Sequence, residues 1–125
     1  MNETNSTDLV LRTKKFALRI IRLHESLPTH GAGKVLGHQV LRSGTSVGAQ
    51  YRKARRARSD AEFVSKIQSA LQELEETAYW LELLAESEIV AAEKLAQLQA
   101  ETNELTAMLT ASAKTVKRRQ AKSRS

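Results

Sequence analysis

Basic side chains are the residues of this sequence whose types and spacing point most directly to chemistry. Five of them fall within seven positions, at Arg52, Lys53, Arg55, Arg56 and Arg58. Others follow at intervals of three and four residues, at Arg12, Lys15, Arg19 and Arg22, and the C-terminal segment adds Lys117, Arg118, Arg119, Lys122 and Arg124. Lysine and arginine neutralise phosphates and release condensed counterions. Three basic features in one small chain therefore indicate binding of RNA or DNA.

The central basic cluster, Arg52 to Arg58, also has a purely structural interpretation. Cations in the last turn of a helix complement its dipole, and they can pair with acids on a neighbouring helix. The sequence leaves both interpretations open. No recognition helix and no aromatic stacking platform accompany the bases, so we expect any nucleic-acid binding to have little sequence specificity.

Residues suited to catalysis or metal binding form no recognisable arrangement. His24, His30 and His38 lack a metal-binding spacing, and His24 lies on an apolar seam where a core histidine is expected. The acids of the segment Glu73 to Glu76 fit a solvated or salt-bridging surface better than a catalytic carboxylate pair. The glycines match neither common phosphate-binding loop. We therefore expect no enzyme activity, no cofactor, no metal site and no small-molecule substrate.

The chain has 125 residues and a mass of 13.9 kDa, which suits a single domain. It has no cysteine and one proline, and its five glycines all lie between Gly31 and Gly48. The long stretches on either side suit helices. The N-terminus does not resemble a signal peptide, and no apolar run is long enough for a membrane span. We expect a cytoplasmic protein.

The net charge of +6 is divided into three blocks along the chain. Residues 1–58 carry 12 lysines and arginines against three acids, residues 59–104 carry two against 11, and residues 105–125 carry six against none. Such blocks can neutralise one another within a bundle or between subunits, and the excess positive charge suits an acidic partner. A nucleic acid is the commonest partner of this kind.

Apolar spacing predicts four helices joined by short turns. The first ends at Pro28, the second runs from about Lys34 to Ala57, the third starts at Ser59, and the fourth runs from about Val90 to Val116. Helices of this length with short connections predict an all-α, antiparallel up-and-down four-helix bundle.

Two details refine these boundaries. Ser59 and Glu62 match a capping box, in which the side chain of each residue binds the backbone N–H of the other. After Val116 the sequence is basic and polar with nothing to bury. We expect residues 1–116 to form the single bundle domain and residues 117–125 to form a disordered basic tail.

Small and aromatic residues indicate further contacts. Gly44 and Gly48 form a flat helix face that another backbone can approach closely, either inside the bundle or in a second subunit. Tyr79, Trp80 and Leu83 spread apolar groups around the third helix, and one bundle cannot cover all of them. We expect these five residues to contribute to an oligomer interface.

Residues 41–84 resemble a small bacterial family of four-helix bundles named after proteins encoded in 23S ribosomal RNA intervening sequences. The likeness lies in the segments LRSGTSVGAQY, SDAEF and ETAYWL. Gln50 and Lys53 stand where the family usually has Asn and Glu, which makes the end of the second helix more basic than the pattern. Members of this family are similar in fold to the accessory variability determinant of diversity-generating retroelements, a basic homopentamer that binds nucleic acid and a reverse transcriptase. The resemblance therefore implies a ring-like homopentamer, contact with nucleic acid, and a reverse transcriptase as a further partner.

The leading functional hypothesis is a non-enzymatic homopentamer that binds RNA or DNA through a basic surface. The alternative is a protein-interaction scaffold that docks an acidic protein or a reverse transcriptase and does not itself bind nucleic acid. Docking of the first helix on a membrane surface is disfavoured because its apolar seams are needed in the core.

Overall fold

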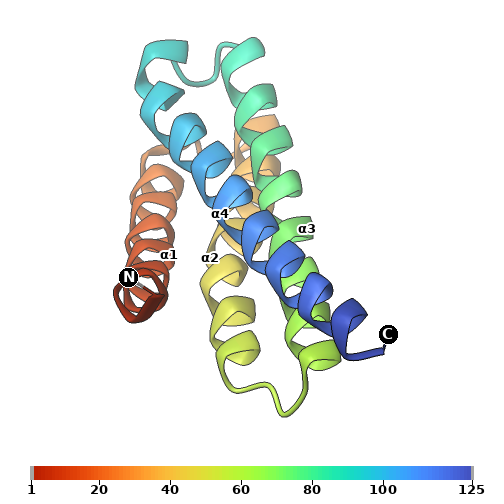
Figure 1. Ribbon diagram of the computed structural model, residues 1–125. Helices are drawn as coiled ribbons and strands as arrows, with labels where there is room; N and C mark the ends of the chain where they lie inside the picture. The colour runs from red at the N-terminus through yellow and green to blue at the C-terminus, as the bar shows by residue number, and fades with distance from the viewer. Residues whose placement is uncertain (1, 125) are drawn as a thin grey trace.

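The computed structural model describes residues 2–124, with side chains from Leu9 onward. It contains four helices: α1 (Asn2–Ser26), α2 (Gly31–Arg55), α3 (Asp60–Glu86) and α4 (Ala92–Arg124). Successive helices run antiparallel and pack as neighbours, and no strand occurs among the described residues (Figure 1). The all-α four-helix bundle predicted from the sequence is confirmed.

The turns follow from local sequence. Pro28 lies between α1 and α2, where its ring prevents the first helix from continuing. The hydroxyl of Ser59 caps α3 by accepting a hydrogen bond from the N–H of Glu62 at 3.1 Å, as predicted. The Glu62 carboxylate, however, accepts the N–H of Arg58 at 3.0 Å, one residue earlier than the capping box predicts. Both bonds satisfy N–H groups next to the start of α3.

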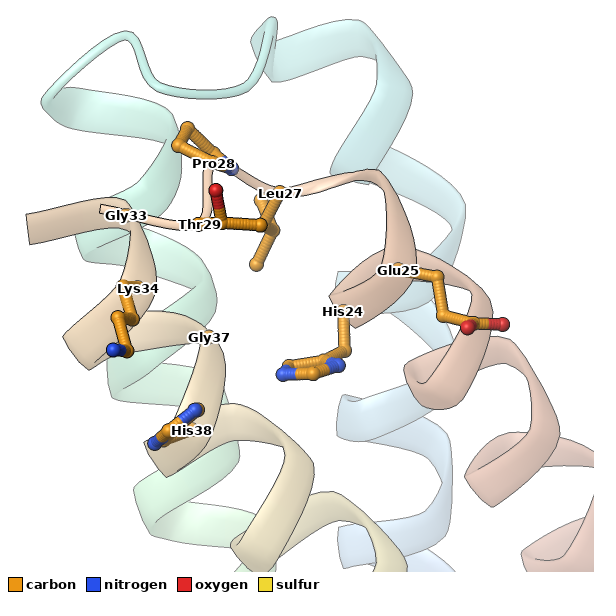
Figure 2. A pocket seen from close by; sticks show the side chains of 9 residues that line it. All are labelled: His24, Glu25, Leu27, Pro28, Thr29, Gly33, Lys34, Gly37 and His38. Carbon is orange, nitrogen blue, oxygen red and sulfur yellow. The ribbon is translucent and has the colours of Figure 1, made fainter. Parts of the chain in front are cut away.

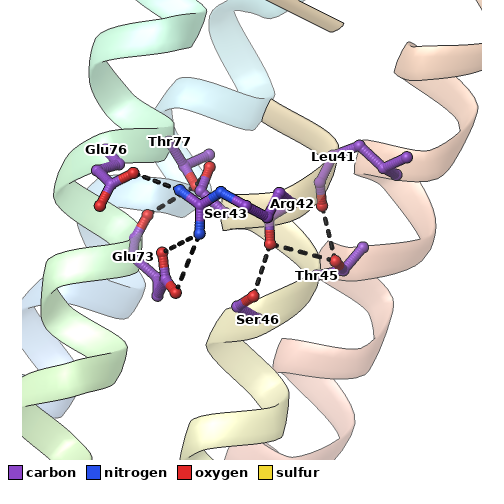
Figure 3. Close-up of polar contacts among 8 residues, drawn as sticks. All are labelled: Leu41, Arg42, Ser43, Thr45, Ser46, Glu73, Glu76 and Thr77. Atoms are coloured by element: carbon purple, nitrogen blue, oxygen red, sulfur yellow. Dashed lines mark hydrogen bonds and ion pairs between the residues drawn. The ribbon is translucent and has the colours of Figure 1, made fainter. Parts of the chain in front are cut away.

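The core is built from the predicted apolar seams. Each helix contributes fully buried side chains: Phe16 and Ile20 from α1, Val40 and Val47 from α2, Ile67, Leu74, Leu81 and Leu84 from α3, and Leu105 and Leu109 from α4. A single cluster joins residues of all four helices. A polar contact also joins two helices there, because the hydroxyl of Ser43 on α2 is 2.8 Å from that of Thr77 on α3 (Figure 3).

Gly44 and Gly48 pack inside the chain, which corrects their assignment to an oligomer interface. Both are buried on the side of α2 that faces α1. A Cβ atom at Gly44 would lie 2.7 Å from Cγ1 of Ile20, and one at Gly48 would lie 3.1 Å from Oγ1 of Thr13. The two glycines let α1 and α2 approach closely. Of the two alternatives that the sequence left open, the structure therefore shows close packing of helices within one bundle.

Helix α4 differs from the other three in its packing and in its length. It packs against α3 but has few contacts with α1, and in Figure 1 it crosses the bundle diagonally. It also continues beyond Val116 to Arg124, where a disordered tail was expected. Helix formers such as Lys, Arg, Gln and Ala fill this segment, so the helix can extend without a core to pack against.

Candidate nucleic-acid interface

The antiparallel arrangement brings two of the three basic features together. The C-terminal ends of α2 and α4 lie at the same end of the bundle (Figure 1). A shallow pocket there is lined by residues of α2, α3 and α4 that include Arg58, Phe63 and Arg119. We call this surface the basic end, and its bases are all exposed: Arg52, Lys53, Arg55, Arg56, Arg58, Lys117, Arg118, Arg119, Lys122 and Arg124.

Most bases of the α2 cluster are not neutralised by the acidic third helix. Arg52, Lys53 and Arg56 make no ion pair with any described residue. Two acids of α3, Glu73 and Glu76, pair with Arg42 instead (Figure 3). The cluster still complements the negative end of the α2 dipole. Its charge nevertheless stays available to a ligand.

Arg119 forms an ion pair at the basic end. Arg119 donates to the carboxylate of Asp60 at 3.0 Å, which ties the end of α4 to the start of α3. Both side chains are largely exposed, so the pair contributes at most about 1 kcal/mol to stability. The two groups also neutralise each other. The site residue Arg119 is therefore a weaker candidate for binding phosphate than Lys117 or Arg118 beside it.

Arg12 is paired inside the bundle, although the sequence assigned it to a nucleic-acid surface. Its guanidinium donates to Glu101 at 2.6 Å and to Glu104 at 3.0 Å, and it also contacts the sulfur of Met108. The hydrogen bond with Glu101 is the largest cause that raises the pKa of Arg12 above its ordinary value, while burial acts in the opposite direction. Arg12 links α1 to α4, where the two helices otherwise have few contacts.

The other bases of α1 are separated from the basic end. Arg19 and Arg22 lie with Lys94 along a groove between the C-terminal part of α1 and the start of α4. Its remaining lining includes Leu23, Val90, Leu95 and Leu98. We call this feature the α1–α4 groove. Lys15 is exposed on α1 but does not line it. The three basic features of the sequence therefore form two surfaces at opposite ends of the bundle.

The aromatic residues of α3 only partly match their expected role. Tyr79 is 53% exposed, while Trp80 and Leu83 are half-buried, and Trp80 packs against the core. The rings of Tyr79 and Trp80 are 5.2 Å apart. Tyr79 is thus the member of this group with most surface left for a second molecule.

Sequence reasoning missed a pocket between the ends of α1 and α2. The rings of His24 and His38 approach within 5.8 Å between their centroids, and the pocket is also lined by Glu25, Lys34 and Gly37 (Figure 2). The two histidines are 14 positions apart (38 − 24), which matches no local spacing, so only the helix packing reveals the pair. No cluster of three or more metal-binding side chains occurs among the described residues.

Sequence reasoning also missed Lys94 in the α1–α4 groove. It is one of only two bases in the acidic block of residues 59–104, so charge counting assigned it to no basic feature. Its position in the first turns of α4, opposite Arg22, follows from the antiparallel packing alone.

Comparison with known proteins agrees with this architecture. Residues 6–111 match the model of the 23S rRNA-intervening sequence protein family, so the chain belongs to that family. The match ends before the last 14 residues, which include the bases that α4 adds to the basic end.

A solved structure is also similar. It is a protein of unknown function from the S23 ribosomal protein family of Bacteroides thetaiotaomicron, 35% identical, with a TM-score of 0.80. The alignment covers 87% of this chain and 97% of the other. No curated protein matches this sequence. Among the described helices, none has an apolar stretch that could cross a membrane.

Proposed function

We propose that this protein is a non-enzymatic, ring-like homopentamer that binds RNA or DNA through its basic end, with little sequence specificity. The main support for this proposal is that exposed bases from the ends of α2 and α4 lie at one end of the bundle. Several of them make no ion pair with any described residue. Unpaired guanidinium and ammonium groups at one end of a molecule make a phosphate-binding surface. The absence of a groove-reading element among the described residues favours backbone contacts over base contacts.

The pentamer and a reverse transcriptase partner enter the proposal through the family resemblance. The family members share a fold with a homopentameric accessory protein of diversity-generating retroelements, and the basic end offers a surface that a nucleic acid and a polymerase could share. A tagged form of the protein should then retain a retroelement reverse transcriptase in the presence of its template RNA and lose it when the RNA is digested.

The nucleic-acid proposal is tested by removing charge at two places. Binding of a labelled duplex is measured by fluorescence anisotropy over a range of salt concentrations for Arg52→Gln with Arg56→Gln. The matched control is Lys14→Gln with Lys34→Gln, which removes the same charge from exposed positions outside the basic end. We expect weaker binding by the first variant, with a log–log salt slope flatter by about 0.9 for each lost phosphate contact. The control should keep the slope of the wild type.

Two results would count against this function. Equal losses in both variants would show that net charge, and not the basic end, attracts the duplex. Unchanged binding by both variants would contradict the assigned surface. If the wild type itself binds no oligonucleotide at low salt, the basic end is better explained as a docking surface for an acidic protein.

A further inference from the structure

Three bases in the α1–α4 groove lack partners inside the chain. Arg19, Arg22 and Lys94 make no ion pair with any described residue, and no acid lines the groove with them. The groove also has an apolar floor, in which Leu95 and Leu98 are buried and Leu23 and Val90 are half-buried. A ligand for this surface needs negative charge at its edges and an apolar group at its centre.

The outer face of α3 has the complementary chemistry. Glu75, Tyr79, Glu82 and Glu86 are exposed and lie at intervals of four, three and four residues, so they share one side of the helix. We call them the acidic face. Its three glutamates make no ion pair with any described residue, and the sequence has no lysine or arginine from position 67 to position 93. Tyr79, 53% exposed, supplies an aromatic group between the acids.

We infer that the acidic face of one copy of this chain docks in the α1–α4 groove of a second copy. Three unpaired carboxylates would meet three unpaired cations, and the ring of Tyr79 would cover the apolar floor of the groove. Complementary charges of this kind fix the register of a contact and speed its formation. The inference rests on the self-association in the proposed function, and it names the two surfaces that form the contact.

The positions of the two surfaces decide what kind of assembly results. The groove lies where α1 ends and α4 begins, and the acidic face lies on the C-terminal half of α3, which is the same end of the bundle (Figure 1). The surfaces are different, so a pair of copies joined by one contact still has one free acidic face and one free groove. Such head-to-tail contacts build rings when the rotation closes.

This contact also divides the basic features by role. Arg19 and Arg22 would be covered by the neighbouring subunit, although the sequence assigned them to nucleic acid. The basic end lies at the opposite end of the bundle and would stay open. Assembly and nucleic-acid binding would therefore be separable by mutation.

The test is charge reversal on each surface, followed by native mass spectrometry and sedimentation velocity. Arg19→Glu with Arg22→Glu should give the mass of a single chain at a concentration where the wild type is assembled. Glu82→Arg with Glu86→Arg should do the same. The chain with all four substitutions should regain the wild-type mass, because every head-to-tail contact is then restored with its charges exchanged. Lys14→Glu with Lys34→Glu is the matched control and should stay assembled.

The outcomes separate this inference from the proposed function. If both double variants keep the mass of an assembled wild type, the surfaces named here are wrong while self-association stands. A monomeric wild type would remove this inference and the proposed ring, while the anisotropy measurement would still decide whether the basic end binds nucleic acid. If reversal of Arg19 and Arg22 leaves the mass unchanged but abolishes oligonucleotide binding, the groove binds phosphate and the inference is overturned. Should the reversed variants lose their helical circular dichroism, Arg19→Gln with Arg22→Gln replaces them, and retention of the wild-type mass overturns the inference.

Discussion

The arginines of this protein have different roles because they face different partners. Arg12 is held by two glutamates of α4, and Arg42 by two glutamates of α3. Arg52 and Arg56 are exposed and make no ion pair with any described residue. The first two residues therefore stabilise the bundle, and the last two are available to phosphate. Side-chain type alone does not distinguish these roles.

Arg12 and Glu101 should be energetically coupled. The two side chains are 27% and 17% exposed, so solvent screens this pair less than a fully exposed one. We expect Arg12→Met and Glu101→Gln each to lower the free energy of unfolding in urea. The double variant should lose less than the sum of the two, with a coupling of about 1 kcal/mol. Lys14→Met combined with Glu101→Gln is the control, and its effects should add. Additive losses for Arg12 and Glu101 would mean that the contact contributes nothing to stability.

Gly44 should tolerate no large side chain. Leucine at this position would overlap the fully buried Ile20 and cost about 1–3 kcal/mol through overpacking. Gly44→Leu is therefore expected to lower the melting temperature measured by circular dichroism. Ala49→Leu places the same side chain on the exposed side of α2 and should melt like the wild type. Equal melting temperatures for both variants would contradict the close crossing of α1 and α2.

At the scale of the elements, α4 combines two segments with different tasks. From Leu95 to Val116 its buried residues complete the core, whereas the turns beyond Val116 lie exposed and carry bases to the basic end. The exposed turns are held to α3 by the pair between Arg119 and Asp60. A helix can extend past its core in this way when its residues have high helix propensity.

Removal of the chain after Val116 should separate these tasks. The truncated protein loses the exposed pair between Arg119 and Asp60 and no core side chain, so its unfolding free energy should fall by only about 1 kcal/mol. Its affinity for a labelled duplex should fall clearly, with a flatter salt dependence, because five bases are lost. Thermal melting and anisotropy are measured on the same samples. A large drop in melting temperature would show that the last turns stabilise the bundle.

At the scale of the whole molecule, charge is separated by surface. The basic end gathers the bases of α2 and α4, while the outer side of α3 is acidic and the α1–α4 groove is basic and apolar. A molecule with a positive end, a negative side and an open groove has complementary surfaces for copies of itself. In the proposed function the basic end is a separate surface for a polyanion.

The purified wild type should therefore be an oligomer, and we expect five chains. Native mass spectrometry at micromolar concentration should give five times the 13.9 kDa mass of one chain. The surface formed by Tyr79, Trp80 and Leu83 should become less accessible in the assembly. Quenching of Trp80 fluorescence by iodide would report this change. A single-chain mass at that concentration would contradict the ring, and another number of chains would contradict the pentamer alone.

The positions of the four helices could be predicted from the sequence, because helix formation depends on neighbours within one or two turns. The apolar spacing predicted the buried faces of all four helices, Ser59 marked the start of α3, and Pro28 separated the first two helices. The segment after Val116 was expected to be disordered because it has nothing to bury. It is helical because its residues have high helix propensity. For the bases at the end of α2 the sequence left two interpretations open, binding of phosphate and pairing with acids of a neighbouring helix.

Which charged side chains form ion pairs depends on the tertiary structure and could not be predicted from the sequence. Arg12 and Glu101 are 89 positions apart, and their contact depends on how α4 crosses the bundle. Lys94 and Arg22 line the same groove because of how α4 packs beside α1. Gly44 and Gly48 lie at the close crossing of α1 and α2. Helix periodicity determines which face of a helix is buried, but ion pairs and grooves depend on the rotation and crossing angle of helices that are remote in sequence. For that reason the sequence shows where the basic residues occur, and only the helix packing shows which of them pair with acids and which are exposed.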